Sequence, residues 1–238
     1  TATYSRVAGE NASPPTYHIT ATLAGALNNY TITNTGADFT IKKATLTITP
    51  DGGKSKIYHA TFSAFTGVVT GLKFSDAVTM TYASGGAPAA AAVGSYDITV
   101  ASVTFTSGSA ANYTIIQNTA VNGLVVTYNI CVLYDPTQPK KLGSTIPIKL
   151  QLCDVNGVNY SSAAITVHAT QLLVIGSTNN PLPPEDSGNA NPDDNFRLAD
   201  GMYIFNLSTK PLFVAKWQLF FTVSGDPGPA HAVQFQLK

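Results

Sequence analysis

Two cysteines are the residues of this 238-residue chain whose chemistry is easiest to state. Cys131 and Cys153 both lie in apolar, strand-like runs, 22 positions apart. A zinc or redox site would need a histidine or a further cysteine at close spacing, and neither is there. We therefore favour a structural disulfide between two strands, with two buried thiols as the alternative. A disulfide would place the protein in an oxidising compartment.

The stretch 185–195 holds the densest group of oxygen donors. Six of its side chains are candidate calcium ligands: Glu185, Asp186, Asn189, Asn191, Asp193 and Asp194. Carboxylate and amide oxygens are the donors that Ca²⁺ prefers, but the spacing is not that of an EF-hand loop. Asn and Asp also close turns by bonding to their own backbone. We favour a surface turn over a calcium site, and we expect no other cofactor.

Three tyrosines near turn signals are candidate ligand-binding residues, because an exposed aromatic ring can stack on the face of a sugar. They are Tyr58, Tyr82 and Tyr160. Trp217 lies in an alternating apolar run, so we expect it in the core.

Residues that could support catalysis are few. The four histidines are not at metal-ligand spacing, and there is no Gly-x-Ser-x-Gly motif and no phosphate loop. A hydrolase would rest on acidic pairs in one loop, whereas a glycosidase needs two carboxylates across a cleft. The sequence therefore predicts that the protein is not an enzyme.

The composition excludes several other classes. Only 11% of residues are charged, and 13 basic side chains balance 13 acidic ones. A chain that is 44% hydrophobic is not disordered. With no excess of Lys or Arg, nothing points to nucleic acid. No run approaches the roughly 20 apolar residues that a membrane helix needs.

Alternation of apolar and polar residues dominates the chain. It occurs over residues 17–23, 45–49, 96–100, 146–152, 203–207, 217–223 and 233–237. A period of two indicates strands with one buried face, and Gly, Pro and Asn turn signals separate them. The sequence predicts an all-β fold of tandem antiparallel β-sandwich, immunoglobulin-like modules.

An internal repeat divides the first half of the chain. Tyr17-His18-Ile19-Thr20 returns as Tyr96-Asp97-Ile98-Thr99, and Asn29-Tyr30-Thr31-Ile32 returns as Asn112-Tyr113-Thr114-Ile115. The shifts are 79 and 83 positions, so the repeated module has about 80 residues. We expect a complete copy at 43–128 and only the C-terminal half of a copy at 1–42. Half a sandwich leaves apolar faces and strand edges open.

Four motifs of the complete copy resemble MBG-type repeats of bacterial surface proteins. They are residues 43–48, 67–72, 94–98 and 112–115. That resemblance implies tandem extracellular β modules within large adhesin-like chains. The usual Tyr-Gly of the family is Tyr58-His59 here.

Residues 129–238 form a different predicted unit. Segments 141–150, 186–193, 203–210 and 233–238 resemble an immunoglobulin-like module placed at the C-terminus of bacterial secreted proteins. The resemblance carries no catalytic residues with it. The usual Lys-Gly-Leu of that pattern is Lys210-Pro211-Leu212 here.

These observations favour a non-catalytic structural or adhesive module array, outside the cell or on its surface. A sharper hypothesis is a fibre subunit whose incomplete module at 1–42 is completed by a strand from another chain. The alternative is a carbohydrate- or surface-binding module of a larger secreted protein. The expected partners are further copies of the chain, neighbouring modules of a longer chain, or surface glycans.

Overall fold

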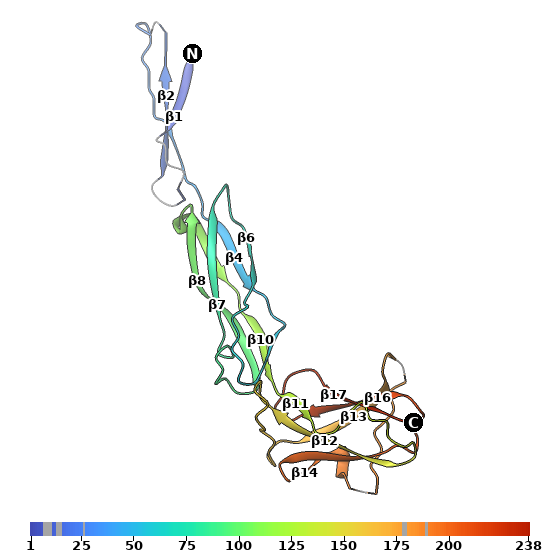
Figure 1. The fold of residues 1–238 in the computed structure, drawn as a ribbon. Helices are drawn as coiled ribbons and strands as arrows, with labels where there is room; N and C mark the ends of the chain where they lie inside the picture. Colours follow the sequence, from blue (N-terminus) through green and yellow to red (C-terminus); the bar gives the residue numbers. More distant parts are fainter. Residues whose placement is uncertain (7–10, 13–15, 26, 178–179, 189) are drawn as a thin grey trace. The chain divides into compact units, whose positions relative to one another are not determined.

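The computed structural model describes residues 1–6, 11–12, 16–25, 27–177, 180–188 and 190–238. Strands make up most of the regular structure, as Figure 1 shows. Within the described residues the helices are two short 3₁₀ turns, η1 (Ala110–Asn112) and η2 (Pro192–Asp194). The prediction of an all-β fold is therefore confirmed.

Contacts divide the chain into two compact units. The first contains Thr1–Asp51, Phe65–Ala83 and Thr99–Ala120, and the second contains Gly52–Ala64, Ser84–Ile98 and Val121–Lys238. Each unit is described by itself below.

The first unit begins with a three-stranded antiparallel sheet, drawn in blue in Figure 1. Its strands are β1 (Ala2–Arg6), β2 (Tyr17–Leu23) and β3 (Ala37–Phe39), in the order β1-β2-β3. Residues directly opposite one another on antiparallel strands point to the same face. Tyr4 therefore shares a face with Ala21, and Ile19 shares it with Ala37. His18 and Asp38 lie on the other face, joined by a hydrogen bond of 2.5 Å.

The same unit contains a second sheet, of order β6-β4-β9. Its strands are β4 (Ala44–Pro50), β6 (Gly67–Thr70) and β9 (Tyr113–Gln117). β4 is antiparallel to β6 but parallel to β9, a feature that residue alternation does not specify. Leu46 and Ile48 of β4 are fully buried.

Residues of β7 and β8 face this second sheet. β7 (Ala77–Ala83) pairs with the later part of β8 (Gly94–Ser107). A Cβ placed on Gly67 of β6 would lie 2.3 Å from the Tyr82 hydroxyl, and the rings of Phe105 and Tyr113 are 5.4 Å apart. These contacts mark the inside of a two-layer sandwich.

The second unit begins with strands β5 (Lys54–Ile57) and β10 (Ala120–Thr127), which run parallel to each other. The whole sheet has the order β5-β10-β8-β7. Ile98, Leu124 and Val126 are fully buried in this part of the unit.

The rest of the second unit is a larger sandwich. Its strands are β11 (Asn129–Val132), β12 (Thr145–Cys153), β13 (Val167–Val174), β14 (Arg197–Ala199), β15 (Met202–Ser208), β16 (Lys216–Val223) and β17 (His231–Gln236). They form one sheet of order β11-β12-β15-β14 and another of order β13-β16-β17. Among the described residues of this sandwich, nineteen buried side chains form its core. Trp217 is 1% exposed within that core, as its alternating pattern predicts, and its indole N–H donates to the Phe213 carbonyl at 3.0 Å.

Candidate functional site: the open face of the N-terminal sheet

The first sheet corresponds strand by strand to part of the complete repeat. Tyr4 lies opposite Ala21, and Tyr82 lies opposite Val100. The repeat shift of 79 takes Ala21 to position 100, so Tyr4 is the counterpart of Tyr82, at a shift of 78 (82 − 4). The shift of 83 takes the first residue of β3, at position 37, to the first residue of β10, at position 120. The order β1-β2-β3 therefore reproduces β7-β8-β10.

The second sheet of the complete repeat, β6-β4-β9, has no counterpart within the described part of residues 1–42. In the complete repeat, Tyr113–Gln117 form β9 and pair with β4. Their counterparts, residues 30–34, are not in a strand. The same sequence motif is thus a strand paired with β4 in one copy and irregular backbone in the other, where the Tyr30 amide donates to the Leu27 carbonyl at 3.0 Å.

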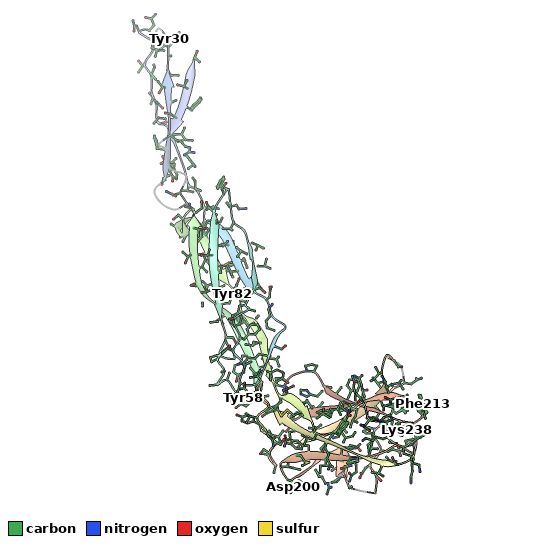
Figure 2. All side chains as sticks on the ribbon, viewed as in Figure 1. Tyr30, Tyr58, Tyr82, Asp200, Phe213 and Lys238 are labelled. Carbon is green, nitrogen blue, oxygen red and sulfur yellow. A yellow bond between two sulfur atoms is a disulfide. The ribbon has the colours of Figure 1, made fainter. Side chains whose placement is uncertain are left out.

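Burial differs between matched residues of the two copies. Tyr30 is 72% exposed whereas Tyr113 is 4% exposed, and Tyr4 is 75% exposed whereas Tyr82 is half-buried. Ile98 is fully buried, whereas its counterpart Ile19 is only partly covered. Figure 2 labels Tyr30 and Tyr82 on the ribbon. In the complete repeat Tyr113 of β9 packs on Phe105 of β8, and Tyr82 of β7 packs on Gly67 of β6, because two sheets face each other. The described residues of the first copy form one sheet, so Tyr30 and Tyr4 lack this cover.

Tyr113 shows how the complete repeat uses this position. Its hydroxyl donates to a carboxylate oxygen of Asp76 at 2.7 Å and accepts from the Lys73 amide at 2.9 Å. The Asp76 amide in turn donates to the Lys73 carbonyl, which closes the turn. Burial, followed by the hydrogen bond to Asp76, raises the pKa of Tyr113, while the Lys73 amide acts in the opposite direction. The tyrosine therefore fastens the loop before β7 to the strand β9.

The open face of the first sheet carries an apolar hollow. It has a volume of about 360 Å³, and Tyr4, Leu23, Leu27 and Ile32 are among the residues that line it. Leu23 and Ile32 are both more than 40% exposed. An apolar sheet face bounded by free edge strands is a surface on which another polypeptide can add strands. We call the apolar side of β1-β2-β3, together with residues 27–34, the open face.

The candidate ligand-binding tyrosines fall into two places. Tyr58 and Tyr160 lie edge to face, with ring centroids 5.0 Å apart, and Tyr128 contacts Tyr58 at 5.9 Å. Tyr82 belongs to the other unit and packs on Gly67. Figure 2 labels Tyr58. The rings of Tyr58 and Tyr160 are engaged with each other, and their role in ligand binding stays a prediction.

His59 stands where the MBG pattern has glycine, and its backbone adopts a φ of 63°. Glycine reaches this left-handed region without the clash that a Cβ brings, so a histidine with this φ costs about 1 kcal/mol. The imidazole gains a contact in return, because its Nδ1 lies 3.0 Å from a carboxylate oxygen of Asp154. Burial acts to raise the pKa of Asp154, but hydrogen bonds from the Val158 amide, His59 and the Asn156 amide outweigh it and lower the pKa.

The candidate calcium ligands form a turn held by Asp186. Its two carboxylate oxygens accept from the amide and the side-chain Nδ2 of Asn191, both at 2.8 Å. Asp193 and Asp194 each have a φ of 55°, beside this turn, while Glu185 is exposed. Asn189 lies outside the described residues. Across the described part of the chain, no three His, Cys, Asp or Glu side chains gather so as to hold a metal ion, and calcium binding stays a prediction.

The two cysteines are joined. Cys131 of β11 and Cys153 of β12 form a disulfide between neighbouring antiparallel strands, in the arrangement favoured from the sequence. The described residues contain no other cysteine, and no helix among them is both long and apolar enough to cross a membrane.

Two residues were missed by sequence reasoning. Phe74 is 99% exposed and has a φ of 55°, at the tip of the turn that Tyr113 fastens.

Lys56 is 7% exposed, and its ammonium group donates to the carbonyls of Ala60 at 2.8 Å and Pro88 at 2.5 Å. Burial lowers the pKa of Lys56. A phenylalanine in a polar turn was a signal that could have been used, whereas nothing local marks Lys56 as buried.

Comparisons with solved structures return arrays of β domains. Three N-terminal domains of the highly immunogenic outer capsid protein (Hoc) of bacteriophage RB49 are 14% identical, with 92% of this chain and 74% of that chain covered and a TM-score of 0.31. Extracellular domains 3–5 of Drosophila OTK are 12% identical, with coverages of 93% and 69% and a TM-score of 0.35. Domains 4–9 of the surface layer protein SbsC are 17% identical, with coverages of 94% and 35% and a TM-score of 0.25. At these values the likenesses carry no argument about function.

No curated protein matches the chain. The family model of the MBG domain (YGX type) matches residues 46–124, within the repeat bounded above at 43–128. Over those residues the resemblance to MBG-type repeats is confirmed.

Proposed function

We propose that this chain is a non-catalytic structural or adhesive segment of the cell exterior, and that the open face joins it to polypeptide outside residues 1–238. The observation that carries the proposal is the contrast between Tyr30 and Tyr113, which share one sequence motif but are 72% and 4% exposed. The match to the MBG domain and the disulfide support an extracellular place for the chain.

The charge of the chain supports joining of this kind. Its formal net charge is zero, so long-range repulsion does little to keep two polypeptides apart. The apolar residues of the open face supply an attraction that increases with the area removed from water. Added strands also satisfy the backbone groups of an edge strand.

Native-state hydrogen exchange tests the proposal, provided that it is measured at a protein concentration at which sedimentation shows the chain to be monomeric. We expect the amides of β2 (Tyr17–Leu23) to exchange much faster than those of the matching part of β8, because no sheet covers them. A monomer in which β2 is as well protected as β8 would overturn the proposal.

The fibre hypothesis is the form of this proposal in which the joining polypeptide is another copy. It predicts that the sedimentation coefficient and the protection of β2 rise together with protein concentration. Ile19→Lys, which places a charge on the open face, should stop both changes. A chain that stays monodisperse and monomeric at high concentration would remove the fibre form.

A second candidate function, binding to a surface or a glycan, is favoured by Phe74. Its ring is almost fully exposed on a left-handed backbone that costs about 1–2 kcal/mol for most residues. Phe74→Asn removes the ring while keeping a residue that tolerates this backbone. Binding to a glycan array should be lost in Phe74→Asn and kept in Val121→Ser, which removes another exposed apolar side chain. Equal binding by the two variants would exclude Phe74 as the contact.

A further inference from the structure

We infer that the polypeptide completing the open face is the N-terminal half of a repeat of the same type, with the residue pattern of positions 43–78. This inference rests on the proposed function of the open face and adds the identity of its partner. The complete repeat is the template, because it shows what covers each matched residue.

The first requirement is a strand that runs parallel to residues 30–34. In the complete repeat, β4 pairs in parallel with β9, with Ala44 opposite Tyr113 and Leu46 opposite Ile115. The counterparts of Tyr113 and Ile115 in the first copy are Tyr30 and Ile32, which keep the same residue types. The partner strand therefore needs apolar residues at the positions of Leu46 and Ile48, both of which are fully buried in the complete repeat.

The second requirement is a glycine over Tyr4. In the complete repeat, the counterpart Tyr82 lies against Gly67, where an added Cβ would meet the tyrosine hydroxyl at 2.3 Å and the Thr49 carbonyl at 2.7 Å. A side chain at the glycine position would displace the ring or the strand. The partner must therefore have glycine at this position if Tyr4 is to be covered as Tyr82 is.

The third requirement is a turn that binds the hydroxyl of Tyr30. Among the described residues this hydroxyl has no hydrogen-bond partner, whereas that of Tyr113 is held by Asp76 and by the Lys73 amide. Burying a tyrosine hydroxyl without a partner is unfavourable. The partner must therefore supply an acceptor at the position of Asp76 and a backbone N–H three residues before it.

A chimera tests these three requirements together. Tyr4 and Tyr82 differ by 78 positions, so a second copy of residues 43–78 joined directly to Thr1 restores the spacing of the complete repeat. The readouts are hydrogen exchange of β2 and nitration of Tyr30 by tetranitromethane, mapped by mass spectrometry. The native Tyr113 of the same molecule reports whether the original repeat is intact.

In the chimera, nitration of Tyr30 should fall by roughly an order of magnitude, to the rate of Tyr113, in line with exposures of 72% and 4%. The amides of β2 should become as protected as those of β8. Asp76→Ala or Gly67→Val in the added copy alone should reverse much of this protection. Ser55→Ala in the added copy, at an exposed position, is the matched control and should change nothing.

Two results would overturn the inference. One is a chimera with an intact native repeat in which Tyr30 reacts as fast as in the chain of 238 residues. The other is protection that Gly67→Val and Asp76→Ala both leave unchanged. If Tyr113 of the chimera becomes reactive, the original repeat is disturbed. Segment 43–78 is then added to the unmodified chain as a separate polypeptide, and hydrogen exchange of β2 and nitration of Tyr30 are measured as before. Fast amide exchange of β2 in the unmodified monomer supports the proposed function even if the inference about the partner fails. Slow amide exchange of β2 in that monomer overturns both the proposed function and the inference.

Discussion

Tyr113 and Asp76 are joined by a hydrogen bond of 2.7 Å that connects strand β9 to the loop preceding β7. We predict that Tyr113→Phe lowers the midpoint of thermal unfolding of the repeat by about 2–4 °C, because the Asp76 carboxylate and the Lys73 amide lose their partner. Tyr30→Phe should leave the midpoint unchanged, since that hydroxyl is exposed. Differential scanning calorimetry of the two variants measures both midpoints. Equal shifts of the midpoint in Tyr113→Phe and Tyr30→Phe would contradict the difference in burial of the two hydroxyl groups.

The matched isoleucines allow a test of core packing. Ile98→Ala should reduce the free energy of unfolding by about 2–5 kcal/mol, as expected when a fully buried side chain leaves a cavity. Ile19→Ala should cost about 1 kcal/mol or less, because the open face leaves this side chain partly in water. Urea denaturation of both variants gives the comparison. A loss of unfolding free energy in Ile19→Ala as large as that in Ile98→Ala would show that the first sheet is already covered.

Asp226 predicts an acid limit to stability. Its carboxylate accepts from Thr127 at 2.6 Å and from the Tyr128 amide at 3.0 Å, and His231 lies 3.1 Å away. Burial acts to raise the pKa of Asp226, but the hydrogen bonds from His231, Thr127 and two backbone amides outweigh it and lower the pKa.

A lowered folded-state pKa means that Asp226 stabilises the fold fully above the ordinary value of 3.8, and that this stabilisation is lost as the pH falls through the lower folded value. Asp226→Asn should reduce the free energy of unfolding near neutral pH by about 1–3 kcal/mol and flatten its dependence on pH below 4. Urea denaturation from pH 2 to 7 checks this. An unchanged acid slope in Asp226→Asn would assign the pH dependence to other carboxylates.

The disulfide between Cys131 and Cys153 closes a loop with a sequence separation of 22. Reduction should lower the free energy of unfolding of the C-terminal sandwich by about 3 kcal/mol, the amount that chain entropy gives for a loop of this length. Cys131→Ser with Cys153→Ser should have the same effect, and adding reductant to that variant should do nothing more. A stability that does not respond to reductant in the unmodified chain would contradict the disulfide.

Much of the fold was predictable because alternating residues specify strands directly. Trp217 and Phe221 share one alternating run, and both are buried in the core of the C-terminal sandwich. The parallel pairing of β4 with β9 was not predictable, since alternation defines a face but not the direction of the neighbouring strand. The sequence repeat located the incomplete copy, but it could not specify how exposed Tyr30 would be.

The candidate site followed from the sequence only in part. The sequence repeat predicts an open half repeat at 1–42. The contacts that define the missing partner depend on the hydrogen bond between Tyr113 and Asp76, which are 37 positions apart. The candidate tyrosines Tyr58 and Tyr160 carry no local signal that they contact each other. Phe74 was overlooked because a single aromatic residue in a turn has no periodic pattern around it.

Tyrosine nitration in the unmodified monomer tests the central claim most directly, because one sample contains both copies of the motif. Tyr30 should react at least several times faster than Tyr113, because Tyr30 is 72% exposed and Tyr113 is 4% exposed. Equal, slow reaction of the two tyrosines would show that the first sheet is already covered, and would contradict the account.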